Sequence, residues 1–175
     1  MNVFLCSTFA DLKAEREAVI AVVQRLQHQY QAMEFFGARP GRPIDTCLDE
    51  VRSSAVVVVV LGFLYGSLSP GLDISYTEAE YQESYRLAKK CLVYMRDEDA
   101  LVPARYHEKD PLKLERFLKF KKTLSDRHTF VPFGDAADLA RKVESDLARE
   151  AQYATLSTPP EATGLDSAEQ TFAHV

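Results

Sequence analysis

The stretch that decides the fold is "AVVVVVLG", residues 55–62. It is apolar from Ala55 to Leu61, without the alternation of apolar and polar residues that is typical of a strand with one face in water. A continuous apolar strand is covered on both faces, as at the centre of a parallel sheet between two layers of helices. We therefore expect a central parallel strand at these residues.

Strand-like and helix-like segments alternate on both sides of this run. Those before it are "NVFLCS" (strand), "TFADLKAEREAVIAVVQRLQHQY" (helix), "AMEFFG" (strand) and "PIDTCLDEVRSS" (helix). Those after it are "SYTEAEYQESYRLAKK" (helix), "CLVYMR" (strand), "DPLKLERFLKFKKTLS" (helix), "HTFVPF" (edge strand) and "DAADLARKVESDLAREAQYA" (helix). With right-handed crossovers, this order predicts an α/β fold of flavodoxin type, a doubly wound five-stranded parallel sheet with strand order 2-1-3-4-5 and helices on both faces.

Length and composition exclude several classes of protein. The 175 residues predict one domain, residues 1–154, and then a flexible linker, residues 155–175, that leads to further domains. The formal net charge of −5 offers no basic stripe for nucleic acid. The longest apolar run is far shorter than the ~20 residues that cross a bilayer, so we expect a cytoplasmic protein without membrane contact. The three cysteines are dispersed, which predicts reduced thiols and no metal site.

The predicted sheet places a ligand-binding crevice between its first and third strands, where the direction of the connections reverses. The loops that leave these strands are "CSTFAD" and "GFLYGSLSPGLDISY". Ser7 and Thr8 of the first loop either cap the following helix or leave its amides to a ligand phosphate. Phe9 in the first loop and Tyr65 in the second are either core aromatics or platforms for a ligand ring.

The helix after the second loop opens with "SYTEAEY" and holds two candidate glutamates, Glu78 and Glu80. Each follows a hydroxyl residue by three positions, so the capping box is either Ser75 with Glu78 or Thr77 with Glu80. At about 100° per residue, Glu80 lies on the inward face of the helix and Glu78 on the solvated face. If Ser75 caps the helix, Glu78 is structural, and Glu80 points into the crevice without a structural partner. Glu80 is then the candidate catalytic carboxylate, with a capping or ion-paired role as the alternative.

On the first helix, Glu15 falls on the apolar face and Arg16 at its border. Because a buried charge needs a partner, we expect Glu15 to pair with Arg16 or Arg52 and to hold the first loop in place. No other catalytic set competes, since the histidines are dispersed and neither a P-loop nor a Gly-x-Ser-x-Gly motif occurs.

Several stretches together resemble a known family, the TIR-like domain of unknown function 4062. They are "CSTFADLKAERE", "MEFFG", "CLDEVRSS", "LGFLYGS", "SYTEAEY" and "LAKKCLVY", and the resemblance covers about residues 1–150. It implies a TIR-like sheet and a place at the N-terminus of NACHT or related signalling NTPases, repeat proteins or bacterial antiviral defence proteins. It also implies kinship with TIR domains and nucleoside deoxyribosyltransferases, which attack the anomeric carbon of a ribosyl-base bond. In those relatives a glutamate on the helix before the fourth strand acts on the ribose, and Glu80 resembles it in place.

Two functional hypotheses follow. In the first, the domain is a signalling or effector domain that binds a nucleotide and cleaves the nicotinamide-ribose bond of NAD, which is a substrate and not a cofactor. Glu80 would steady the oxocarbenium-like ribosyl centre. The substrate would be held by Ser7, Thr8, Phe9, Tyr65, Ser75 and Tyr76. In the second hypothesis, the domain is a non-catalytic module that self-associates or binds other domains of the same chain.

Overall fold

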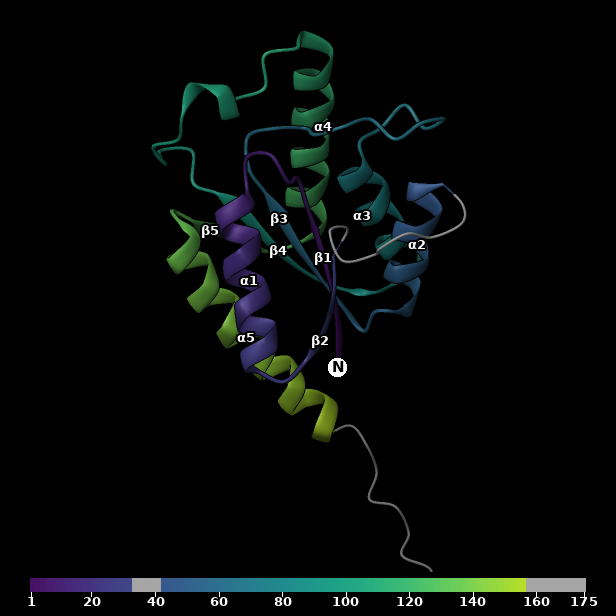
Figure 1. Ribbon diagram of the computed structural model, residues 1–175, viewed down its shortest axis with the longest axis vertical. Helices are drawn as coiled ribbons and strands as arrows, with labels where there is room; N and C mark the ends of the chain where they lie inside the picture. Colours follow the sequence, from purple (N-terminus) through teal and green to yellow (C-terminus); the bar gives the residue numbers. More distant parts are fainter. Residues whose placement is uncertain (33–41, 157–175) are drawn as a thin grey trace, which may run out of the picture.

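The computed structural model describes residues 1–32 and 42–156 (Figure 1). One five-stranded sheet has the order β2-β1-β3-β4-β5, and every neighbouring pair is parallel. Its strands are β1 (Asn2–Ser7), β2 (Gln29–Gln31), β3 (Val56–Leu61), β4 (Lys90–Arg96) and β5 (Phe130–Phe133). The helices are α1 (Lys13–Arg25), α2 (Pro43–Ser53), α3 (Tyr76–Arg86), the 3-10 helix η2 (Ala104–Tyr106), α4 (Pro111–Arg127) and α5 (Ala136–Leu156). The predicted doubly wound α/β fold and its strand order are confirmed.

The central strand β3 is buried at every position, between β1 and β4. Figure 1 shows α1 and α5 on one side of the sheet and α2, α3 and α4 on the other. Alternate residues of β3 enter two separate cores: Val56, Val58 and Val60 face α1 and α5, whereas Val57, Val59 and Leu61 face the other layer. Because both faces are covered by helices, apolar residues are required at every position, which explains the unbroken run in the sequence.

The connection from α1 to β2 differs from the prediction. Helix α1 ends at Arg25, and Gln27 takes a positive φ of 56°. The chain then reverses, and Gln29–Gln31 pairs with the start of β1. Tyr30, predicted on the helix, is therefore a strand residue, because pairing with an existing strand edge outweighs helical spacing here. The predicted strand "AMEFFG" lies outside the described residues apart from Ala32.

Two further expectations concern the end of the chain and the membrane. Helix α5 continues through Leu156, two residues beyond the predicted domain boundary at 154, and the rest of the predicted linker lies outside the described residues. In the part of the chain that the structure describes, no helix combines the length and the apolar character that crossing a membrane requires.

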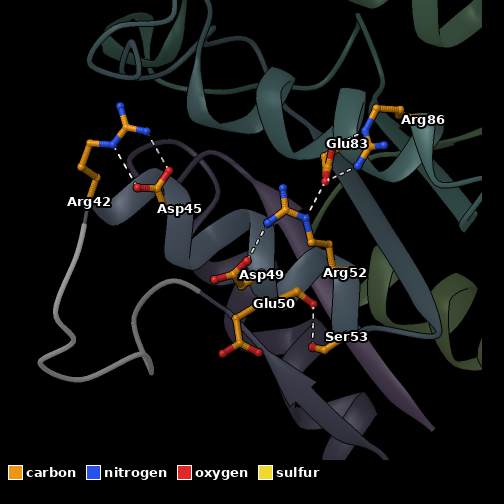
Figure 2. A network of polar contacts seen from close by, with 8 residues as sticks. All are labelled: Arg42, Asp45, Asp49, Glu50, Arg52, Ser53, Glu83 and Arg86. Atoms are coloured by element: carbon orange, nitrogen blue, oxygen red, sulfur yellow. Dashed lines mark hydrogen bonds and ion pairs between the residues drawn. The ribbon is translucent and has the colours of Figure 1, made fainter.

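Charged side chains join α2 to α3, as Figure 2 shows. Glu83 accepts hydrogen bonds from Arg52 of α2 at 2.7 Å and from Arg86 at 2.7 and 2.8 Å. Arg52 also donates to Asp49 at 2.6 Å. Beyond the end of α3, Lys89 donates to two main-chain carbonyls at the end of α2, at 2.6 and 2.7 Å. The hydrogen bonds from Arg86 and Arg52 lower the pKa of Glu83 to about 2. This network fixes α3, the helix that carries Glu80, against its neighbour.

Candidate functional site

A pocket of about 510 Å³ lies at the carboxyl ends of β1 and β3, where the sequence predicted a crevice. It brings together the predicted residues Ser7, Thr8, Phe9, Tyr76 and Glu80. Arg16 also lies on the pocket wall, whereas the sequence placed it only near the first loop. The rest of the lining, not predicted residue by residue, is Leu5, Ala10, Leu64, Gly66, Ser67 and Thr77.

Glu80 lies on the second turn of α3 and is only 4% exposed. The Cys6 thiol on β1 donates to the main-chain carbonyl of Thr77 at 3.3 Å. Burial raises its pKa well above the ordinary value, and the neighbouring Glu80 carboxylate raises it further. The same two causes raise the pKa of Cys47 on α2 to about 12. The expectation that Glu80 has no partner is therefore wrong. Two protonated thiols from different elements lie beside this carboxylate.

Ser7 and Arg16 form a second polar group on the pocket wall. The Arg16 Nη1 donates to the hydroxyl oxygen of Ser7 at 2.6 Å and to its main-chain carbonyl at 3.2 Å. The guanidinium carbon lies 5.9 Å from the ring centroid of Phe9, within range of a cation–π contact, and the Phe9 side chain is 57% exposed. Ser7 does not cap α1, because Leu12 occupies the N-cap position. The pocket thus combines an exposed ring with a buried cation.

The predicted ion pair of Glu15 has a different partner. Glu15 pairs with Arg96 of β4, and both side chains are almost fully buried. Arg96 also donates to the main-chain carbonyl of Gly134 at 3.3 Å. Successive helix residues differ in direction by about 100°, so Glu15 faces β4 while Arg16 turns to the pocket.

Asp11 connects the two loops of the pocket, and sequence reasoning missed it. Its Oδ1 accepts a hydrogen bond from the hydroxyl of Thr8. Its Oδ2 accepts from the main-chain amides of Phe63 and Leu64, at 3.1 and 3.2 Å. Burial raises the pKa of Asp11. Gly62 permits this close approach, since a Cβ atom there would lie 2.2 Å from Asp11 Oδ2.

Tyr65 and Ser75, both expected to bind substrate, do not line the pocket, and their hydrogen bonds support the start of α3. Ser75 accepts a hydrogen bond from the amide of Glu78 at 3.2 Å, so the Ser75 register of the two possible caps is the one formed. The hydroxyl of Tyr65 accepts from the amide of Ser75 at 3.2 Å and donates to the Glu78 carboxylate at 2.5 Å. It therefore bridges the two ends of the capping box. Burial and the Glu78 carboxylate raise the pKa of Tyr65 to about 12.

The loop between β3 and α3 is also held on its outer side. The carboxylate of Glu108 accepts from the amide of Tyr65 at 3.2 Å, and the Lys113 ammonium donates to the carbonyl of Gly66 at 3.2 Å. The ring of Phe63 stacks on that of His107, with centroids 4.8 Å apart. The segment between β4 and α4 and the first turn of α4 thus fix one wall of the pocket. Within residues 1–32 and 42–156, no group of three or more His, Cys, Asp or Glu side chains could hold a metal ion.

Comparison with known proteins identifies the family of this chain. Residues 2–148 match the family described as Domain of unknown function (DUF4062). The chain belongs to the DUF4062 family. No curated protein matches this DUF4062 domain in sequence.

Two solved structures resemble the DUF4062 domain in fold. The Clostridium botulinum CMP N-glycosidase BcmB is 14% identical, with a TM-score of 0.49 over 85% of this chain and 99% of that chain. A probable GTP-binding protein, engB, is also 14% identical, with a TM-score of 0.47 over 86% of this chain and 99% of that chain. With TM-scores below 0.5, neither structure carries an argument on the activity of the DUF4062 domain.

Proposed function

We propose that this DUF4062 domain binds a nucleotide and hydrolyses the bond between ribose and base, with NAD as substrate and Glu80 as the catalytic carboxylate. One observation carries the proposal. Glu80, 4% exposed, lies on the wall of the 510 Å³ pocket at the reversal point of the sheet. A carboxylate held away from bulk water stabilises a developing cation far more strongly than one in solution.

The proposed reaction is a hydrolysis at C1′ of the ribose. The C1′–N bond breaks, its electron pair stays on the ring nitrogen, and nicotinamide leaves as a neutral molecule. Glu80 steadies the oxocarbenium-like ribosyl centre, as carboxylates do in glycoside hydrolysis. The oxygen of a water molecule then bonds to C1′, and its proton passes through the Glu80 carboxylate to solvent. The products are nicotinamide, ADP-ribose and a proton.

The remaining pocket residues match the other parts of such a substrate. Phe9, which is exposed, and Tyr76, which is partly buried, lie on the pocket wall and offer aromatic faces to the base. The buried guanidinium of Arg16, held in place by Ser7, offers positive charge to a phosphate.

The protonation chemistry of the pocket favours a pyridinium base over a neutral one. A neutral base must gain a proton to leave, whereas the positively charged nicotinamide ring leaves without one. Among the described residues that line the pocket there is no histidine or lysine. The thiols beside Glu80 are poor acids, since the pKa of Cys47 is raised to about 12 and that of Cys6 is also raised. The resemblance to TIR-like domains supports the same chemistry, and we extend the proposal to a cytoplasmic signalling or defence protein that contains further domains.

The test is release of nicotinamide from NAD by a concentrated sample of the domain. Glu80→Gln keeps the shape of the side chain and removes its charge, so we expect turnover to fall at least about a hundredfold. Glu78→Gln is the matched control on the same helix, outside the pocket. It should lower stability, because it removes the charge of the capping carboxylate. It should keep most of the turnover, because the oxygen of the introduced amide still accepts the hydrogen bond from Tyr65. Equal turnover by the parent and Glu80→Gln, or none by a parent that self-associates, would overturn the enzymatic proposal in favour of a non-catalytic interaction module.

A further inference from the structure

Two adjacent hydroxyls on the pocket wall have their hydrogen-bond directions fixed by their partners. The first belongs to Ser7. A guanidinium group can only donate, so Ser7 Oγ must accept the 2.6 Å hydrogen bond from Arg16. The hydrogen of the Ser7 hydroxyl is left for a different acceptor. Ser7 therefore presents a donor.

The second hydroxyl belongs to Thr8 and has the opposite direction. An ionised carboxylate can only accept, so Thr8 must donate its hydrogen to Asp11 Oδ1. The amides of Phe63 and Leu64, at 3.1 and 3.2 Å from Oδ2, add two further donors, which favour the ionised form and oppose the rise in the pKa of Asp11 that burial causes. With its hydrogen used, the Thr8 oxygen can only accept a hydrogen bond from a ligand.

We infer that Thr8, set by Asp11, is a specificity-determining residue that selects a ligand carrying an N–H donor. This inference rests on the proposed function and narrows its substrate class to nucleotides whose ring bears an amide or amino group. For a nicotinamide nucleotide, the carboxamide N–H₂ meets Thr8, and a ribosyl or phosphate oxygen meets Ser7. Thr8 and Ser7 thus read opposite hydrogen-bonding groups on one ligand.

Asp11→Asn reverses the direction of the Thr8 hydroxyl with almost no change of shape. The amides of Phe63 and Leu64 hold the oxygen of the introduced side-chain amide, because they need an acceptor. Its NH₂ group then faces Thr8 and donates to the hydroxyl oxygen. The hydrogen of Thr8 is released and turns to the ligand, so Thr8 presents a donor.

The experiment compares NAD with its 3-acetylpyridine analogue, in which a methyl group replaces the amide NH₂. Both side groups are uncharged and similar in size, and the ratio of kcat/KM for the two substrates is measured for each variant. Thr8→Val, which has no hydroxyl, should lower the ratio of NAD to analogue about tenfold relative to the parent. Asp11→Asn should lower it at least as much. Thr8→Ser, which keeps the hydroxyl, should preserve it. The intrinsic reactivity of the two leaving groups cancels in this comparison.

A second measurement separates this inference from the proposed reaction. Free nicotinamide and free 3-acetylpyridine are titrated into the parent, Thr8→Val and Asp11→Asn and followed by NMR, which needs no turnover. A preference for nicotinamide that disappears in both variants supports the role of Thr8, even if the parent cleaves no NAD and the proposed reaction fails. NAD cleavage with the same substrate ratio in the parent, Thr8→Val and Asp11→Asn would overturn the inference and leave the reaction standing. Absence of both cleavage and ring binding would overturn both.

Discussion

Replacing Tyr65 by phenylalanine removes a single buried hydroxyl and, with it, two hydrogen bonds. One of them satisfies the amide of Ser75, a residue that is 0% exposed, and an amide left unsatisfied in such a place costs about 1–3 kcal/mol. The other is made to the Glu78 carboxylate, which is partly exposed and also accepts from Gln82 at 3.0 Å, so water replaces part of it. We therefore expect Tyr65→Phe to lower the free energy of unfolding by about 2–3 kcal/mol, or the melting temperature by roughly 5–10 °C.

The assay is urea denaturation monitored by circular dichroism. The urea concentration at the midpoint should fall, and the dependence of the free energy of unfolding on urea concentration (the m-value) should stay unchanged. Tyr85→Phe is the control, because it makes the same chemical change on a tyrosine of α3 whose side chain is 47% exposed. High pH gives a second check on Tyr65. Its pKa is raised from 10 to about 12 in the folded protein, so its contribution to the free energy of unfolding is complete below pH 10 and is lost as pH rises toward 12. The difference in the free energy of unfolding between the parent and Tyr65→Phe should therefore narrow over that range. If Tyr65→Phe lowers the free energy of unfolding at neutral pH by less than about 0.5 kcal/mol, as much as Tyr85→Phe does, the bridging role of the hydroxyl is refuted.

Three other predictions concern stability. Gly62→Ala should cost about 1–3 kcal/mol, because its Cβ atom would lie 2.2 Å from a carboxylate oxygen, whereas Gly134→Ala, with nothing within 4 Å, should be nearly neutral in the same thermal melt. Glu83→Gln should lower the free energy of unfolding by about 2 kcal/mol at pH 7. Because the pKa of Glu83 is lowered to about 2 in the folded protein, this difference from the parent should vanish as pH falls from 4.5 to 2. A difference between the two urea denaturation midpoints that stays constant over that range would contradict the prediction. Arg96→Met leaves the buried Glu15 without its ion-pair partner and should lower the free energy of unfolding by about 3–5 kcal/mol. Adding Glu15→Met should recover much of this loss, whereas simply additive losses would show that the two side chains act independently.

The features that sequence predicted well are those encoded by neighbouring residues. The unbroken apolar run of β3 indicated a strand covered on both faces, and the order of strands followed from the regular alternation of elements. The cap formed by Ser75 and Glu78 was among the two predicted registers because a capping box spans only four positions. The pocket position followed from the strand order, since the two loops that leave β1 and β3 must meet.

The features that sequence reasoning missed are long-range hydrogen bonds. Asp11 binds amides more than fifty positions away, and Glu15 binds Arg96 across 81 positions. Neither distance leaves a periodic pattern in the sequence. Asp11 did offer one local signal, because it is a lone carboxylate in the short loop that leaves β1 at the reversal point of the sheet. Tyr65 was assigned to the ligand because its loop is rich in glycine, but its hydroxyl is used inside the protein.

Most of the polar side chains that attach helix α3 to the rest of the domain lie outside the pocket lining. Apart from Glu80, the polar side chains that attach it, which include Ser75, Glu78 and Glu83, do not line the cavity, whereas Tyr76 and Thr77 do. Changes at the two lining positions therefore leave the anchoring of the helix intact. A library randomised at Tyr76, and restricted to small residues at Thr77 because that residue is only 4% exposed, should yield mostly folded proteins, which makes α3 a natural starting point for altering what this pocket accepts.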